Sequence, residues 1–526
     1  MAASATPVCE TTEIFNIIGS FGKWQKIVFA IFFCVNTVGI FQNFAMTFLA
    51  PNMDFWCIEP AVNYSWTLNS TNLPGFNRED QCYVSVSNNS STTRMNSDEL
   101  NLNHTIKCTK WEYDTSYYSH TVVSEWDLVC DREWLVSLSK SIYMFGFLLS
   151  VFVFGQVSDC IGRFPTIVIS YLVTVASLLL SLLSTSYSMF AILRFFQAFG
   201  RTGLTTVGFV LLMEIIGSAH RTNVGMAIQL GWSTGLFFLA GIGFFFRHWF
   251  WFQVAIAVPI LPLAIGYKYI PESPRWLLMQ RKYKKLEKVL ETAAVMNKKE
   301  IKCDMKDLIT NKFAVSAEGE KGTRKTVLDI FKTPKMRNRA FNMIYLWIVN
   351  AFLYYAMAFN TNDLAGDSYL NFFVSGALEF PSYAVTYIGV RYYGRRPSLV
   401  GLMLIGGAAC GAQIFVPETL SWLTVTFAMI GRFCITGSFG ILYLYTTELF
   451  PTVVRNAAIG TCSMFGRIGS IVAPFMRELG RATHPSVPSV VYVVLAFSSG
   501  LLALLLPETK DKQIPDTIEE GENFGE

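Results

Sequence analysis

Two ionisable residues, Glu379 and Arg467, lie near the middle of long apolar segments. A charged side chain at the centre of a bilayer costs about 2.5 to 3.5 kcal/mol on insertion scales, so each one needs water, a bound ion or a partner. A guanidinium binds carboxylates well, and a carboxylate binds cations. We therefore expect both side chains to face a water-filled cavity, where Arg467 binds an anionic group and Glu379 a cationic group. The alternative is a structural ion pair between Glu379 and Arg467 that never contacts a ligand.

Aromatic residues would complete such a site, because a quaternary ammonium is weakly hydrated and is well held by aromatic faces. Tyr354 and Trp232 lie in apolar segments, and Gln229 lies three positions before Trp232. Most aromatic residues in spanning helices are packing or interface residues, which is the alternative for each of them. Arg201, in a third apolar segment, is a further candidate for the cavity.

A second set of charged residues stands at the ends of apolar segments and repeats along the chain. The pattern Glu-x6-Arg occurs at Glu214 and Arg221 and again at Glu448 and Arg455. Other short phrases recur in the same order, which indicates two homologous halves. Parallel repeats of this kind are typical of transporters whose substrate site lies near the midplane between the halves.

A short polar phrase, GxxxDxxGR, contains Asp159 and Arg163 between two apolar segments. Its second copy keeps an arginine at Arg395 but has Arg391 where the aspartate would stand. We expect these residues and the two Glu-x6-Arg pairs to form a charge network between the halves, which closes an inner gate and breaks when the bundles rock. An ordinary turn between helices is the alternative for this phrase.

The segments that must position these residues are long and apolar. Of the 526 residues, 52% are hydrophobic and 15% are charged, which is too apolar for a soluble protein of this size. Runs of about 20 apolar residues can cross a bilayer. We predict twelve such spans, at 27–49, 136–157, 165–185, 187–213, 223–245, 249–270, 340–359, 369–390, 398–416, 419–446, 457–476 and 487–506. They predict an all-α membrane protein with twelve transmembrane helices in two six-helix bundles.

One long polar loop, residues 51–135, follows the first span. Its four cysteines suggest two disulfides with three possible pairings, and the residues are Cys57, Cys82, Cys108 and Cys130. It also carries five Asn-x-Ser/Thr sequons for glycosylation, at Asn63, Asn69, Asn88, Asn89 and Asn103. A lysine- and arginine-rich stretch follows the sixth span, and the positive-inside rule places it in the cytoplasm. The polar loop is then extracellular and both termini are cytoplasmic.

These patterns divide the chain into five parts. They are a cytoplasmic N-terminal segment (1–26), an N-terminal six-helix bundle (27–270) that includes the loop 51–135, a cytoplasmic linker (271–339), a C-terminal six-helix bundle (340–506) and a cytoplasmic tail (507–526).

Several phrases of the chain resemble a known family. The GxxxDxxGR phrase at 155–163 resembles the signature of the major facilitator superfamily. Within it, the phrases at 111–131, 270–278, 360–371 and 446–456 are similar to the organic cation, organic anion and carnitine transporters, solute carrier family 22. The resemblance covers nearly the whole chain. It implies the major facilitator fold, with two six-helix bundles and alternating access.

The same resemblance bears on the site residues. Anion- and carnitine-transporting members are similar to this sequence in having arginine at the position of Arg467, where cation-transporting members have aspartate. Glu379 matches an acidic position of the cation and carnitine branches. Tyr354 and Gln229 fall at positions that the resemblance associates with substrate contact. Together these matches imply a zwitterionic substrate.

We therefore expect a plasma-membrane transporter of small organic ions, namely carnitine-like zwitterions or organic cations, with organic anions as the alternative. A membrane receptor that binds the same ligands without moving them is an alternative of another class. The sequence contains no nucleophile and base arrangement, metal-ligand spacing or phosphate-binding loop, so no enzyme, metal or cofactor is expected. The net charge of +4 gives no sign of a nucleic-acid partner. The sequence does not determine coupling to sodium, protons or the membrane potential.

Overall fold

The computed structural model describes residues 18–60, 82–85, 105–299, 330–512, 515 and 517–524. The five predicted glycosylation sites, Asn63, Asn69, Asn88, Asn89 and Asn103, lie outside these residues.

Long helices account for most of the described chain. The first half contains α2 (Lys23–Leu49), α4 (Trp134–Ile161), α5 (Arg163–Ser181), α6 (Tyr187–Ile215), α7 (Ser218–Phe245), α8 (Trp249–Ala257) and α9 (Leu263–Gly266). The second half contains α15 (Pro334–Phe359), α16 (Ser368–Ala377), α17 (Glu379–Tyr392), α18 (Arg395–Ala412), α19 (Ser421–Leu449), α20 (Arg455–Val472), α21 (Met476–Ala482) and α22 (Val487–Ala503). Within the described residues, ten helical segments are long and apolar enough to cross a membrane, and α22 is a shorter apolar helix.

Two predicted spans are interrupted, and proline explains both interruptions. The span predicted at 369–390 divides into α16 and α17 at Leu378, because Pro381 has no N–H to donate to the carbonyl of Ala377. The span predicted at 249–270 becomes α8, a short 3-10 turn that contains Pro259, and α9. The first interruption matters for the site, because it places Glu379 in the first turn of α17.

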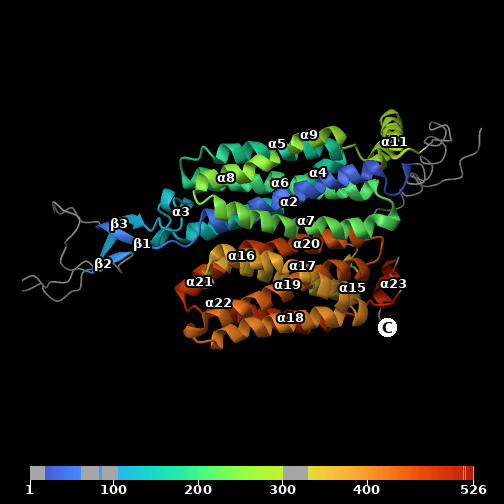
Figure 1. Ribbon diagram of the computed structural model, residues 1–526. Coiled ribbons are helices and arrows are strands. Elements are labelled where there is room, and N and C mark those ends of the chain that lie inside the picture. The colour runs from blue at the N-terminus through green and yellow to red at the C-terminus, as the bar shows by residue number, and fades with distance from the viewer. Residues whose placement is uncertain are drawn as a thin grey trace, which may run out of the picture.

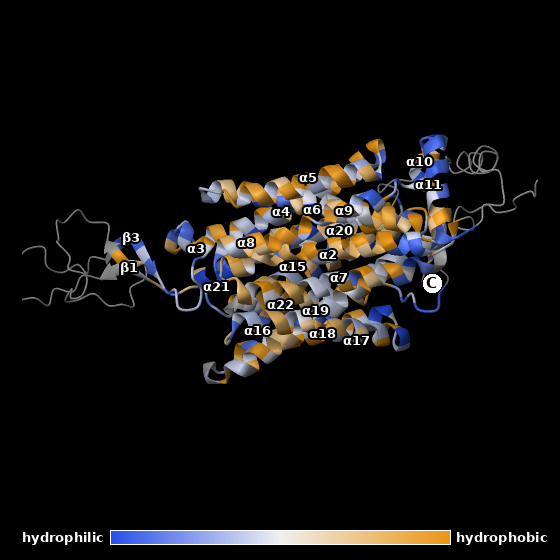
Figure 2. Cartoon of the chain, turned by 45° about the horizontal axis from the view of Figure 1, so that its top comes forward, coloured by the Kyte–Doolittle hydropathy of each residue, from blue (hydrophilic) through white to orange (hydrophobic). Residues whose placement is uncertain are grey.

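The helices form two groups (Figure 1). The blue-to-green helices of the first half lie side by side above the orange-to-red helices of the second half, with α7 and α20 near the boundary. Much of the helix ribbon in Figure 2 has the orange of hydrophobic residues. Many large apolar side chains are exposed, among them Leu172, Phe245 and Leu505. Such exposed apolar surface fits contact with lipid.

The two ends of the helical body differ. At one end, here named the outer end, a three-stranded sheet in the order β1-β3-β2 is built from β1 (Phe55–Pro60), β2 (Tyr83–Ser85) and β3 (Thr105–Tyr113). Two disulfides join Cys57 to Cys108 and Cys82 to Cys130, which is one of the three pairings that the sequence allowed. The opposite end, here named the inner end, carries the polar helix α11 (Tyr283–Asn297) (Figure 1).

Candidate functional site

Arg467 lies on α20, where the second half of the protein meets the first. Its guanidinium carbon is 3.9 Å from the centre of the Phe147 ring, which belongs to α4 in the first half. One of its terminal nitrogens donates a hydrogen bond of 3.4 Å to the hydroxyl of Tyr355 on α15. Within the described part of the chain, Arg467 has no ion pair with a carboxylate. Its charge therefore stands at the interface of the halves, held by a ring and a hydroxyl.

A second arginine approaches the same ring from the first half. Arg201 on α6 is only 2% exposed, and its guanidinium carbon lies 5.9 Å from the Phe147 ring and 5.7 Å from the Trp232 ring. Its terminal nitrogen donates a 2.5 Å hydrogen bond to the side-chain oxygen of Asn43 on α2. Gly39 leaves room for this side chain, because a Cβ there would lie 2.7 Å from the Arg201 Nε. Two guanidiniums thus lie beside the Phe147 ring, and neither forms an ion pair with a carboxylate of the described residues.

Glu379 has a different environment, because it is fully buried and its charge is balanced. Its carboxylate accepts hydrogen bonds from the hydroxyl of Tyr354 at 2.7 Å and from the hydroxyl of Ser233 at 2.8 Å. It also forms an ion pair of 3.1 Å with Arg432 on α19. The start of α17 favours a carboxylate as well, because the N-terminal end of a helix carries partial positive charge.

The Glu379 cluster crosses between the two halves. Ser233 and Trp232 lie on α7 in the first half, whereas Glu379 and Tyr354 lie in the second. The indole N–H of Trp232 donates to the Tyr354 hydroxyl at 2.8 Å, and that hydroxyl donates onward to Glu379. Any movement that separates α7 from α15 and α17 must break both hydrogen bonds that cross the boundary.

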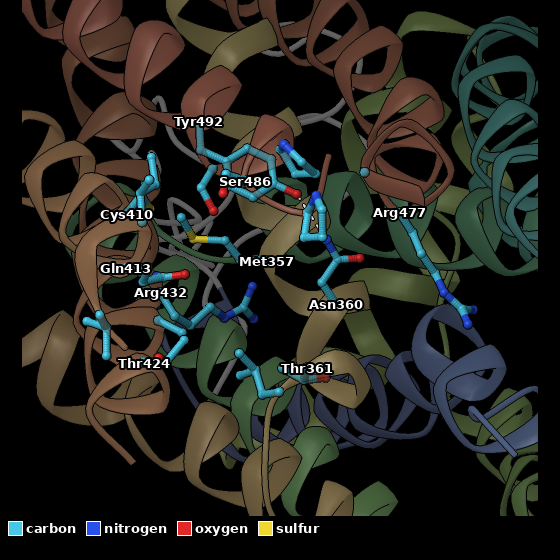
Figure 3. Close-up of a pocket in the computed structure, with 18 of the residues that line it drawn as sticks. Met357, Asn360, Thr361, Cys410, Gln413, Thr424, Arg432, Arg477, Ser486 and Tyr492 are labelled. Carbon is cyan, nitrogen blue, oxygen red and sulfur yellow. Dashed lines mark hydrogen bonds between the residues drawn. The ribbon is translucent and has the colours of Figure 1, made fainter. Parts of the chain in front are cut away.

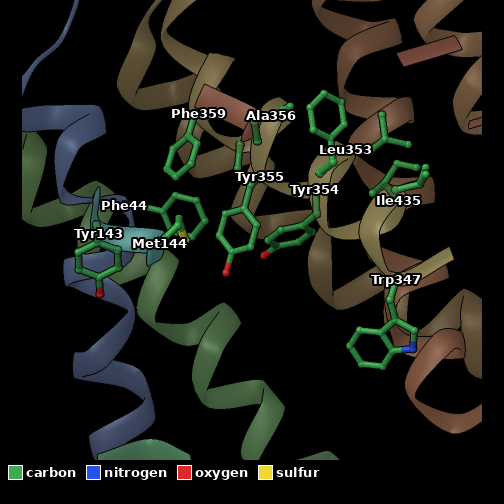
Figure 4. Close-up of a cluster of buried hydrophobic side chains, with 14 of the residues drawn as sticks. Phe44, Tyr143, Met144, Trp347, Leu353, Tyr354, Tyr355, Ala356, Phe359 and Ile435 are labelled. Atoms are coloured by element: carbon green, nitrogen blue, oxygen red, sulfur yellow. The ribbon is translucent and has the colours of Figure 1, made fainter. Parts of the chain in front are cut away.

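Aromatic side chains surround these polar groups. Figure 4 shows Phe44 of α2 next to Tyr355 and Phe359 of α15, with Tyr143 of α4 on the other side of Phe44. The centre of the Phe44 ring lies 6.1 Å from that of Tyr355, 5.6 Å from that of Phe359 and 6.3 Å from that of Trp232. Gln229, the remaining residue predicted to bind substrate, is exposed on α7, one turn of the helix before Ser233.

Arg432 is the residue of this site that the sequence analysis missed. It is 3% exposed, and besides Glu379 it donates a 2.7 Å hydrogen bond to the carbonyl of Tyr354. The alternative that paired Glu379 with Arg467 was wrong, because Arg432 occupies that place. A signal existed, since Arg432 repeats Arg194 of the first half. Arg194 is likewise buried and donates to a carbonyl of α2, that of Gln42, at 3.0 Å.

The charges at the inner end form two networks, each within one half. In the first half, Arg163 makes paired hydrogen bonds of 2.9 and 3.1 Å to Glu214, and a third of 2.9 Å to Asp159. In the second half, Arg395 makes paired bonds of 2.7 and 2.9 Å to Glu448. The predicted pairing of these residues between the halves is therefore not formed here, because bidentate partners on adjacent helices of the same half satisfy both arginines.

Two glutamates complete these networks at the starts of α5 and α18. The carboxylate of Glu272 accepts from the backbone N–H of Arg163 at 2.7 Å, and that of Glu508 accepts from the N–H of Arg395 at 3.0 Å. Burial raises the pKa of Glu508, but donation by the N–H groups of Arg395 and Lys510 outweighs it and keeps the pKa below its usual value. Glu508 is therefore ionised at neutral pH and counters the exposed N–H groups of α18.

The second-half network offers a matched pair of variants. Arg395→Ala removes the bidentate bond to Glu448, so we expect the free energy of unfolding to fall by about 1.5 to 3 kcal/mol and maximal uptake to decline. Arg396→Ala should change little, because Arg396 contacts Glu508 through its backbone N–H, which alanine retains. Thermal melting and uptake per surface-expressed molecule measure both effects. Equal behaviour of the two variants would show that the side-chain bond is unimportant.

Three other predicted gating residues lie near these networks. The Arg221 Nε donates to the carbonyl of Ile216 at 3.0 Å. Arg455 begins α20, and Arg391 is exposed in the last turn of α17.

The outer end holds the halves together. Glu133, just before α4, forms ion pairs with Arg477, at 3.1 Å, and with Arg481, both on α21 in the second half. The hydroxyl of Tyr117 donates to Asp367, the residue that caps α16, at 2.7 Å. These contacts, here named the outer lock, join the halves on the side of the disulfide-bonded loop.

We expect Glu133→Gln to open the outer end. The change removes two partly exposed ion pairs, each worth up to about 1 kcal/mol, which together shift an equilibrium by up to roughly thirtyfold. The reactivity of a cysteine introduced at Ser141, a buried residue bonded to Ile471 across the halves, reports the opening when a charged thiol reagent is added. Glu112→Gln in β3 is the control. No difference in labelling rate between the two variants would rule out this role for Glu133.

Comparison with known proteins bears on the whole chain. The profile of the family described as "Sugar (and other) transporter" matches residues 72–519. The chain is 35% identical over 525 residues to the "Organic cation transporter protein" of Drosophila melanogaster, covering 98% of this chain and 94% of that protein. It is 32% identical to "Solute carrier family 22 member 16" of Xenopus laevis, with the same shares covered.

The fold is similar to that of the xylose transporter XylE from E. coli in a partially occluded inward open conformation. The TM-score is 0.58 at 13% identity, and the match covers 96% of this chain and 100% of the XylE chain. At that identity the likeness concerns the fold alone. It confirms the predicted architecture of two helical bundles. The predicted disulfides in the loop after the first span are present in the structure of this chain.

Proposed function

The chain belongs to the major facilitator superfamily and, within it, to the organic cation, organic anion and carnitine transporter family, and from this premise we propose that it moves small organic ions by alternating access. It is a multi-pass membrane protein. We place it in the plasma membrane, with the outer end extracellular and both termini cytoplasmic, and we keep the predicted sequons as glycosylation sites and the five-part division of the chain.

A substrate with a carboxylate fits the site best. The observation that carries this proposal is the position of Arg467, 3.9 Å above the Phe147 ring at the boundary of the halves and without a carboxylate partner among the described residues. Arg201 adds a second guanidinium beside the same ring. Two cations in a region of low dielectric repel each other, and an anionic group between them would relieve that repulsion.

The cationic end of a zwitterion fits the aromatic side of the site. Phe44, Tyr355 and Phe359 form a buried aromatic group, and aromatic faces can hold a quaternary ammonium without a full negative charge. The Nζ of Lys140 already lies 5.3 Å from the centre of the Phe359 ring, so this group does attract a cation. Glu379 is bonded to the Tyr354 hydroxyl and would attract the ammonium through space, without direct contact. The ion pair with Arg432 already balances most of its charge. We therefore propose a carnitine-like zwitterion, bound with its carboxylate toward Arg467 and its ammonium toward these rings. Trp232 and Gln229 on α7 would line the same space.

The contacts that join the two halves indicate how the halves would move during transport. The outer lock, the bond from Trp232 to Tyr354 and the bond from Ser233 to Glu379 join the halves in this conformation. The networks of Arg163 and Arg395 lie within single halves, so they would brace each bundle as it rocks. We propose that opening to the outside breaks the crossing contacts while both inner networks persist.

A second candidate substrate is an organic cation. It is favoured by the names of the relatives and by the presence of a buried carboxylate, Glu379, beside the aromatic rings. It would not explain why two guanidiniums face Phe147, and for that reason it ranks second.

Uptake and counterflow in proteoliposomes test the proposal. The purified chain should accumulate labelled carnitine in exchange for carnitine inside the vesicle, more efficiently than an organic cation of similar size without a carboxylate. Saturable binding without accumulation would instead indicate a receptor. Better exchange of the plain cation would reject the zwitterion and favour the second candidate.

A further inference from the structure

A separate pocket opens at the outer end, entirely within the second half. Its volume is about 770 Å³, within the range of small-molecule sites. It is bounded by the outer ends of α15, α18 and α19, by α21 and by the start of α22. Figure 3 shows its lining, with Met357 near the end of α15, Asn360 directly after that helix, and Gln413 and Thr424 across from them. Its lining includes neither Arg467 nor Phe147, and the residue that it shares with the candidate functional site is Arg432.

The charges around this pocket are positive. Its described lining contains the three arginines Arg432, Arg477 and Arg481 but no aspartate or glutamate. At the rim, Arg477 and Arg481 both form ion pairs with the carboxylate of Glu133. In Figure 3 the Arg477 guanidinium points away from the other labelled side chains. Its positive charge would therefore attract an anionic ligand at a distance and not by direct contact.

Arg432 lines this pocket and has one buried N–H donor without an acceptor among the described residues. Arg432 is 3% exposed, and its terminal nitrogens donate to Glu379 and to the Tyr354 carbonyl. Its Nε has no hydrogen-bond partner among the described residues. An unsatisfied buried donor costs about 1 to 3 kcal/mol, more for a charged group, and an acceptor in the pocket would remove that cost. Figure 3 shows Arg432 extending from α19 toward Met357 and Thr361.

The remaining lining selects for a partly apolar ligand. Met357, Leu364, Ile414, Val416 and Met429 contribute apolar surface between the positive rim and Arg432. An inorganic anion would leave this surface and most of the volume unused. A carboxylate with an aromatic or aliphatic body would use both, with its oxygen toward the Arg432 Nε and its body along the apolar wall.

We propose that this pocket binds an amphipathic organic monocarboxylate from the outer side and acts as a regulatory site. The ligand would brace Arg432, which also holds Glu379 and Tyr354, and these two residues bond to Ser233 and Trp232 across the boundary. Occupancy therefore stabilises the closed outer end and lowers maximal exchange without displacing substrate.

Thermal melting of the purified full-length protein in nanodiscs tests the binding, with 4-phenylbutyrate as the probe and 4-phenylbutanol as its uncharged analogue. Thr424→Trp and, separately, Gln413→Trp fill the pocket. Thr426→Trp is the matched control, because Thr426 is exposed two residues along the same helix. Arg467→Gln tests whether any shift arises at the substrate site instead.

We expect 4-phenylbutyrate to raise the melting temperature of the wild type, of Thr426→Trp and of Arg467→Gln. Its apparent Kd should rise at least tenfold in whichever of the two pocket-filling variants folds. The proposal is overturned by any of three results: no shift in the wild type at millimolar probe, an equal shift with the alcohol, or a shift that survives pocket filling. A shift lost only in Arg467→Gln would assign binding to the substrate site and also overturn it.

Discussion

Arg467→Asp is expected to abolish most uptake of carboxylate-bearing substrates. The change removes a charge-assisted hydrogen bond worth about 1.5 to 3 kcal/mol and places a negative charge where the substrate carboxylate would bind, so uptake at low substrate should fall by roughly ten- to a hundredfold or more. Uptake of a plain organic cation should be retained or rise. Arg201 lies beside the same ring and should partly compensate in the milder Arg467→Gln variant.

Lys288→Asp serves as the control for that experiment, because it makes the same change of charge on the exposed surface of α11. Labelled carnitine and a cation of similar size are compared at equal surface expression. If Arg467→Asp takes up both carnitine and the cation at the rates of the wild type, Arg467 has no part in substrate recognition.

The buried pair of Glu379 and Arg432 is expected to govern stability. Removing one partner leaves an uncompensated buried charge, and such changes cost about 3 to 5 kcal/mol. We therefore expect Glu379→Gln or Arg432→Gln alone to lower the melting temperature sharply. The double variant should recover most of the loss, because two neutral amides need no counter-charge and can still bond to Tyr354 and Ser233.

The comparison of single and double variants separates this ion pair from independent effects. Additive losses in the double variant would show that the two charges do not compensate each other. Ser382→Ala is a useful control for the region, because it removes a buried hydrogen bond, to the Phe433 carbonyl at 2.7 Å, between α17 and α19 without changing charge.

The sequence predicted the spans well, because a bilayer demands about twenty apolar residues and few other patterns produce that length. It did not predict the break at Leu378, because the proline that causes it, Pro381, lies in an otherwise apolar run. The break moves Glu379 from a predicted mid-helix position to a helix start, where Arg432 can reach it.

The partners of charged residues were the least predictable feature. Arg467 was identified from its isolation in an apolar segment, and the structure places it at the boundary of the halves. The predicted charge network between the halves is not formed here, because Arg163 pairs with Glu214 and Arg395 with Glu448, each within one half. The Glu-x6-Arg spacing gives no information about which neighbouring helix a side chain meets. The disulfide pairing was undetermined for the same reason, since three-dimensional proximity is not contained in the spacing of cysteines.

The most direct test compares one substrate with and without its negative charge. Exchange of carnitine and of carnitine methyl ester is measured in proteoliposomes containing the wild type or Arg467→Gln. If Arg467 recognises the carboxylate, the wild type prefers carnitine by roughly tenfold or more, and the preference falls severalfold in the variant, where Arg201 beside the same ring retains part of it. An unchanged preference in Arg467→Gln would contradict the account.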